Sequence, residues 1–303
     1  MEFLAALLLA GLVAGYLVLA GCDIGLGMLM PYVARTGAER RRAVSAMAPY
    51  FLGSEVWLIG AVGVAMGLLP ALKSHVFTGL WPVFAALLAG WLLRDAGLWM
   101  RGRMRTGAAR AVCDTGIVGG SWALALSWGA VVGGLLAGGG VLSPVALACA
   151  PAAAALFALR GAAFGAERLL PVSADTAARA TRPLARTALA GGAVAAGASA
   201  LPGGVAAERP LAAAAAALVV LGAPAATSGL SGPRLSRHTS AAALASVPLL
   251  IAAAVDLPVE PVPAGTAVLF WSALAPVVPF MVLGQVWLYR MVRRPAPDPG
   301  FFG

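Results

Sequence analysis

Long apolar segments separated by short basic connectors dominate this sequence of 303 residues. A helix needs about 20 apolar residues to cross the hydrocarbon core of a bilayer. Segments near that length are residues 3–31, 50–70, 75–97, 114–138, 141–163, 187–205, 210–230, 239–256 and 265–290. Only 11% of the residues are charged, whereas a soluble domain carries about a quarter. The sequence therefore predicts an all-α polytopic membrane protein with nine transmembrane helices.

The basic residues lie almost entirely in alternate connectors. If the N-terminus is outside the cell, all but two of the 21 Lys and Arg residues fall on the cytoplasmic side, and only Lys73 and Arg209 remain outside. Cytoplasmic loops of membrane proteins carry such an excess of basic residues. This pattern predicts that the N-terminus is outside and the C-terminus is cytoplasmic. It also accounts for the net charge of +9 without a nucleic-acid-binding face.

Two carboxylates lie inside the first two predicted spans. Asp23 precedes Pro31 by eight residues, and Glu55 lies about five residues into the second span. A helical rise of 1.5 Å per residue places both about 10 Å from the cytoplasmic ends of their spans. Acidic side chains within the bilayer are costly and commonly mark proton or ion paths. Asp23 and Glu55 are therefore predicted to share or relay a proton, the alternative being that each hydrogen-bonds a neighbouring helix.

Two further acids are candidates for the same path. Asp95 follows Arg94 at the cytoplasmic end of the third predicted span, and Asp114 opens the fourth. A carboxylate at a helix N-terminus also complements the helix dipole, which is the simpler interpretation of Asp114.

No metal or cofactor motif is visible in the chain. His75 and His238 have no second ligand at metal-binding spacing, and Cys22, Cys113 and Cys149 form no CxxC pair. The cysteines are predicted to be small buried apolar residues. The sequence therefore predicts no metal site and no redox centre on this chain.

Glycines recur at four-residue spacing in several spans. The pairs are Gly11 with Gly15, Gly21 with Gly25, Gly63 with Gly67, and Gly129 with Gly133. Small residues at this spacing let helix backbones approach closely in membranes, so these pairs predict close helix packing.

Several segments, taken in order, resemble subunit II of cytochrome bd quinol oxidase. GCDIGLGMLMPY, RRR and APYFLGSEVWLIG are similar to that family's opening motif, its RR turn and its APHWDGN[QE]VWL stretch. The likeness continues in LLRDAGLWMRGRMR, in CDTGIVGGSWALALSWGAVVGGLLAG and in FWSALAPVVPFMVLGQVWLYRMVRR. It covers roughly residues 1–140 and 265–294, whereas the Ala-rich middle carries little of it.

This resemblance implies two four-helix bundles, in residues 1–138 and 141–256, and a peripheral last helix in residues 265–290. It also implies a partner subunit I that carries haem b and haem d, with no haem on this chain. Such a complex lies in the bacterial cell membrane, oxidises quinol outside, takes protons from the cytoplasm and reduces oxygen to water. A structural quinone and a small accessory subunit are further partners that the resemblance suggests.

This chain departs from the family pattern at two acidic positions. The family's His-Trp-Asp-Gly is replaced by residues 50–53, Tyr-Phe-Leu-Gly, so Leu52 stands where the resemblance places a proton-entry aspartate. Ala20 replaces the first acid of the opening motif. Asp23 and Glu55 remain, so either these two carry the remaining proton path or the path runs through subunit I alone.

Two other functions fit parts of the sequence. A secondary transporter or ion-coupled permease would suit an odd number of spans, helices interrupted by Gly and Pro, and intramembrane acids, but no internal repeat is visible. A non-catalytic scaffold that only stabilises an oxidase subunit is the third reading.

Overall fold

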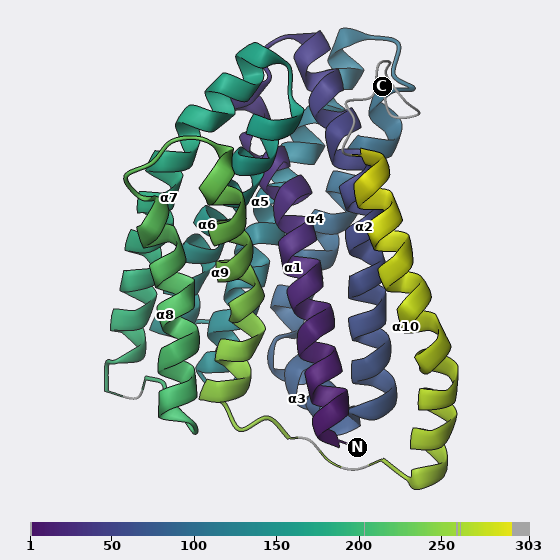
Figure 1. The fold of residues 1–303 in the computed structure, drawn as a ribbon, viewed down its shortest axis with the longest axis vertical. Helices are drawn as coiled ribbons and strands as arrows, with labels where there is room; N and C mark the ends of the chain where they lie inside the picture. The colour runs from purple at the N-terminus through teal and green to yellow at the C-terminus, as the bar shows by residue number, and fades with distance from the viewer. Residues whose placement is uncertain (1, 203, 259, 261, 293–303) are drawn as a thin grey trace.

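Ten helices make up most of the structure, a computed structural model that describes residues 2–202, 204–258, 260 and 262–292. In chain order they are α1 (Glu2–Val33), α2 (Gly37–Leu68), α3 (Pro70–Gly79), α4 (Trp81–Arg101), α5 (Gly107–Leu136), α6 (Pro144–Arg168), α7 (Pro171–Ser199), α8 (Pro210–Thr227), α9 (Pro233–Ala254) and α10 (Ala264–Val292). The long helices follow the long axis of the molecule, and α3 is a short piece at one end (Figure 1). These residues contain no strand, so the all-α prediction is confirmed.

Seven helices in the described part of the chain are long and apolar enough to cross a membrane: α1, α2, α4, α5, α6, α8 and α10. The sequence also predicts spans at α7 and α9, and these two helices do not meet that test. Arg179, Arg182 and Arg186 lie in α7, and α9 begins with Arg234 and Arg237. Ala, Gly and Ser fill much of the remainder of both helices, so each contains few strongly apolar side chains.

The third predicted span, residues 75–97, begins at the wrong place. A break at Leu80 separates α3 from α4, and Leu80 has a non-helical backbone with φ −113° and ψ 17°. Pro82 lies in the first turn of α4, where its missing N–H is tolerated. The break therefore starts a new helix at Trp81, six residues after the predicted start.

The basic segment of residues 40–42 is helical, although the sequence suggests a turn there. Thr36 caps α2 and forms a capping box with Glu39, because each side chain accepts a hydrogen bond from the other residue's backbone N–H. Helix α2 thus begins thirteen residues before the predicted second span. Thr106 similarly caps α5, accepting a hydrogen bond from the N–H of Ala109.

Helices α1 and α6 cross with their backbones in contact. A Cβ atom added at Gly25 would overlap the carbonyl group of Phe157, and one added at Gly161 would overlap the backbone of Gly25. Helix α1 also packs against α2, α5 and α9, so it lies at the centre of the helix assembly (Figure 1). These two glycines therefore set how closely the first half of the chain meets the second.

The other predicted glycine contacts have different outcomes. Gly129 and Gly133 lie against the backbone of α6, so that pair is confirmed as a close helix contact. Gly15 and Gly67 instead make room for aromatic rings, those of Trp57 and Phe270. A Cβ atom at Gly11 or Gly63 would meet nothing within 4 Å, so neither takes part in close packing.

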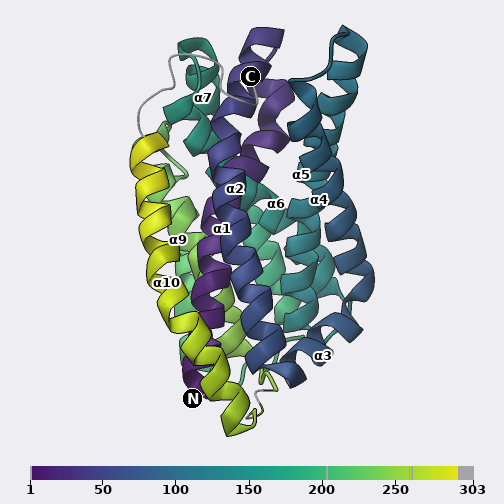
Figure 2. The ribbon, with the colours of Figure 1, turned by 90° about the vertical axis from the view of Figure 1, so that its right-hand side faces the viewer.

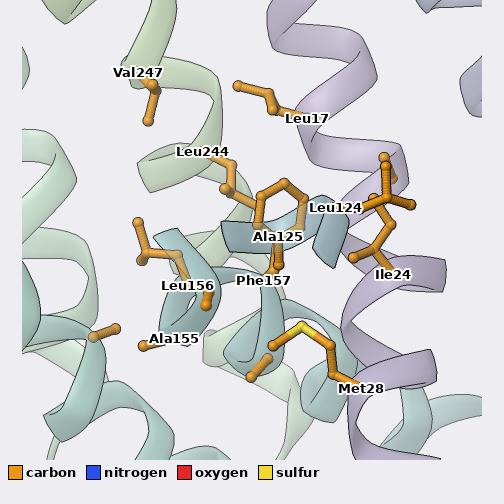
Figure 3. Close-up of a cluster of buried hydrophobic side chains, with 14 of the residues drawn as sticks. Leu17, Ile24, Met28, Leu124, Ala125, Ala155, Leu156, Phe157, Leu244 and Val247 are labelled. Atoms are coloured by element: carbon orange, nitrogen blue, oxygen red, sulfur yellow. The ribbon is translucent and has the colours of Figure 1, made fainter. Parts of the chain in front are cut away.

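The main apolar core joins both halves of the chain. Figure 3 shows Phe157 and Leu156 of α6 among side chains from α1, α5 and α9, including Leu17, Leu124 and Leu244. The three cysteines are buried and free, as predicted. Helix α10 lies at the edge of the assembly against α2 (Figure 2), and the side-chain amide of Gln285 donates a 2.9 Å hydrogen bond to the carbonyl of Gly53.

Candidate functional site

A buried ion pair links α1 to α4. The guanidinium Nη1 of Arg94 lies 3.1 Å from Oδ2 of Asp23, and their side chains are 4% and 1% exposed. Gly120 of α5 provides the room, because a Cβ atom there would lie 2.6 Å from the backbone nitrogen of Arg94. The Phe51 ring centroid lies 5.5 Å from Cζ of Arg94, within the range of a cation–π contact.

Two more carboxyl groups lie near this ion pair: Arg94 binds Asp95, and Trp91 of the same helix binds Glu55. Nε of Arg94 donates a 3.1 Å hydrogen bond to Oδ1 of Asp95, which lies one turn after Trp91 on the same face of α4. The indole N–H of Trp91 donates a 3.1 Å hydrogen bond to Oε1 of Glu55. Asp23, Arg94, Asp95, Glu55 and Trp91 thus form one group, which we call the carboxyl cluster.

Asp23 and Glu55 are therefore brought together through α4 and not by direct contact. Asp23 lies ten residues before the end of α1, and Glu55 lies eighteen residues after the start of α2. At 1.5 Å per residue these offsets differ by about 12 Å, so the two acids are not at matching distances from the connector that joins their helices. Arg94 and Asp95 of α4 lie between the two acids and bridge this offset.

Asp114 belongs to a second, separate group. Nη1 of Arg40 lies 3.0 Å from Oδ2 of Asp114, and Nε of Arg101 donates to its Oδ1. Asp114 is the eighth residue of α5, whose cap is Thr106, so the interpretation as a helix-terminal acid is wrong. Ion pairs to α2 and α4 explain its burial instead.

Trp91 is the member of the carboxyl cluster that the sequence alone did not single out. A signal was available in the spacing, since Trp91, Arg94 and Asp95 follow the i, i+3, i+4 pattern that places side chains on one helix face. Leu52, the position of the missing aspartate, has a side chain that is 44% exposed. Ala20 is buried.

An apolar cavity adjoins the carboxyl cluster. Its volume is about 620 Å³, and side chains from α1, α2, α3, α4, α5 and α9 line it, with Trp91 among them. Lys73 is the charged residue in its wall. The described residues contain no group of three or more His, Cys, Asp and Glu side chains that could hold a metal ion.

Comparison with known proteins gives one consistent family. The family profile described as "Cytochrome bd terminal oxidase subunit II" matches residues 1–292. The Escherichia coli K12 protein "Cytochrome bd-I ubiquinol oxidase subunit 2" is 33% identical over 138 residues, which are 46% of this chain and 36% of that protein. The "Probable cytochrome oxidase subunit 2" of Haemophilus influenzae is 30% identical over the same shares of the two chains.

A solved structure shares the fold. A chain of the bd oxidase from Geobacillus thermodenitrificans superimposes with a TM-score of 0.64, covering 97% of this chain and 99% of that chain. The sequence identity is 10%, so this likeness concerns the fold alone.

Proposed function

This chain belongs to the cytochrome bd terminal oxidase subunit II family, and from that premise we propose that it is the haem-free subunit of a membrane-bound quinol oxidase. The observation that carries the proposal is the family match over residues 1–292. The expected partner is a subunit I that holds haem b and haem d, with a small accessory subunit beside them. The complex would oxidise quinol and reduce oxygen to water in a bacterial cell membrane. No observation favours a transporter over this function.

Co-purification tests the proposal. When this chain is tagged and expressed with the subunit I of its own organism, we expect the two to purify together and to show haem b and haem d absorption bands. The chain expressed alone should carry no haem bands. Haem bound to this chain alone, or purification without subunit I, would contradict the proposal.

We further propose nine crossings, with residues 1–138 and 141–256 as two four-helix bundles and residues 265–290 as the peripheral helix. The start of α1 and the end of α10 lie at opposite ends of the molecule, which supports an odd number of crossings (Figure 1). With the N-terminus outside, connectors 137–143 and 200–209 would be external, and connectors 102–106 and 228–232 cytoplasmic.

Fusions of alkaline phosphatase at these four connectors test this topology, because the enzyme is active only outside the cytoplasm. We expect activity at 137–143 and 200–209 and none at 102–106 and 228–232. The fusion at 200–209 decides whether α7 crosses the membrane, because this connector directly follows α7. An inactive fusion there would rule out a crossing by α7.

For the proton path, we propose that the carboxyl cluster replaces the acid missing at position 52. Asp95 lies one turn after Trp91, the residue that binds Glu55, so the proposed step is a proton transfer between these two carboxyl groups. Arg94 then connects this pair to Asp23 on α1. Asp114 is left out of the relay, because guanidinium groups hold both of its oxygens.

Removing one carboxyl group at a time tests the relay. In the complex with subunit I, Glu55→Gln and Asp95→Asn are each expected to slow oxygen consumption and proton uptake at least tenfold, the scale of losing a proton-transfer group. Asp175→Asn, at an exposed acid on α7, should leave both rates unchanged. Wild-type rates in both cluster variants would reject the relay and leave the path to subunit I.

We also propose that the 620 Å³ cavity holds the apolar chain of a structural quinone. Its wall is almost wholly apolar, and its size lies within the usual range for ligand pockets. Lys73 could donate a hydrogen bond to a quinone carbonyl at one end of this cavity. Extraction of the purified complex should recover bound quinone, and a cavity-filling Ala61→Phe variant should lose it.

A further inference from the structure

Arg160 is a cation in the apolar part of α6, and it has no acidic partner in the part of the chain that the structure describes. Its Nε donates a 3.2 Å hydrogen bond to the carbonyl of Val18 on α1, and its Nη1 donates a 2.6 Å bond to the carbonyl of Arg237 on α9. Among the described residues, no carboxylate oxygen lies within 4.0 Å of this guanidinium. Glu167, the acid of the same helix, pairs with Arg237 instead.

A cation at this position is costly unless an anion accompanies it. Charged side chains in membrane helices are normally paired or face a polar partner, because hydrocarbon does not solvate them. Two backbone carbonyls satisfy two donors of Arg160 but do not neutralise its charge. Arginine presents five donors, so the guanidinium retains donors for an anionic oxygen.

The surroundings of Arg160 are apolar on one side. Leu17, Phe157 and Leu244 line a second cavity of about 340 Å³ between α1, α5 and helices α6 to α9. Phe157 is one turn from Arg160 on α6, and Leu17 precedes the residue whose carbonyl Arg160 binds. A Cβ atom at Gly21 would touch both Arg160 and Leu244 at 2.8 Å, so the aliphatic stem of Arg160 lies beside Leu244 in the cavity wall.

The cavity extends away from the charge towards the opposite end of the helices. Its far wall contains Ser199, at the end of α7, and Pro210, at the start of α8. Arg237, by contrast, lies in the first turns of α9, at the other end of that bundle. The site therefore combines one cation at one end with an elongated apolar space that begins beside it.

We infer that this site binds one anionic phospholipid, with its phosphate on Arg160 and an acyl chain in the 340 Å³ cavity. A free phosphate would satisfy the charge but leave the apolar cavity unfilled, and a zwitterionic lipid would bring a second cation with its phosphate and so add no net counter-charge. The binding does not depend on the oxidase activity of the complex. It would supply the missing counter-ion and fill the apolar cavity beside Arg160.

The test uses the delipidated complex of this chain with subunit I, probed by thermal unfolding. Added phosphatidylglycerol is expected to raise the unfolding temperature of the wild type by several degrees, whereas phosphatidylcholine and inorganic phosphate do not. Arg160→Gln should lose this response, and Arg160→Lys should keep the preference for the anionic lipid. Arg234→Gln, at an exposed arginine on α9, is the matched control and should respond as the wild type.

A second variant addresses the cavity separately. Ala217→Leu adds volume in its wall and should weaken the phosphatidylglycerol response without altering Arg160. An equal response of Arg160→Gln and wild type would overturn the proposal, as would stabilisation by inorganic phosphate alone. An unchanged response in Ala217→Leu would exclude the acyl chain from this cavity.

Discussion

Replacing Gly161 with leucine is expected to prevent this chain from reaching its folded state. Even one added carbon at Gly161 would overlap the backbone of Gly25, and backbone atoms of two packed helices cannot move aside as a flexible side chain can. Overpacking a close-packed site commonly costs about 1–3 kcal/mol, and a backbone overlap lies at or above the upper end of that range. We expect little folded protein in detergent extracts, measured by fluorescence-detected size-exclusion chromatography of a tagged chain.

Gly11→Leu is the matched control for this experiment. Gly11 lies on α1, the helix that Gly161 contacts, and a Cβ atom there would meet nothing within 4 Å. This variant should elute as the wild type does. Equal recovery of the Gly161→Leu and Gly11→Leu proteins would show that α1 and α6 do not cross at these glycines.

The second large effect is expected from Arg94→Met, which leaves Asp23 buried without its cation. Neither oxygen of Asp23 has a hydrogen-bond partner of good geometry among the described residues, so the ion pair is its main compensation. Breaking a buried ion pair from one side typically costs about 3–5 kcal/mol. Thermal unfolding of the purified complex should therefore show a markedly lower transition temperature.

A double variant separates the stability lost with the ion pair from the stability lost with side-chain packing. Asp23→Asn combined with Arg94→Met removes both charges, and it should recover part of the stability that Arg94→Met alone loses. Arg105→Met, at an exposed arginine in the connector after α4, should have little effect. A double variant no more stable than Arg94→Met would show that the ion pair contributes little.

The acids of the candidate site were visible in the sequence, but their partners were not. Asp23, Glu55 and Asp95 stand out because ionisable residues are rare in apolar segments. Whether they meet depends on how each helix is rotated about its axis, and apolar composition does not specify that rotation. Asp114 illustrates the difficulty: its place near a predicted helix start favoured a dipole interaction, whereas the fold pairs it with Arg40 and Arg101.

For helix boundaries too, the sequence shows some features and hides others. Caps such as Thr36 with Glu39 are local, yet a hydropathy reading looks for apolar residues and so begins the second span thirteen residues late. The break at Leu80 was likewise hidden, because the apolar run continues across it.

The sequence by itself determined that this chain forms apolar helices, and its motif order identified the family. Both properties depend on residues that are close together in the sequence, so they can be recognised without knowing which distant residues are in contact. Only the tertiary structure decided that Arg94 joins Asp23 and Asp95, that Gly25 meets Gly161, and that Arg160 has no acidic partner among the described residues. These depend on contacts between segments up to 142 residues apart, which arise only when the helices pack against one another.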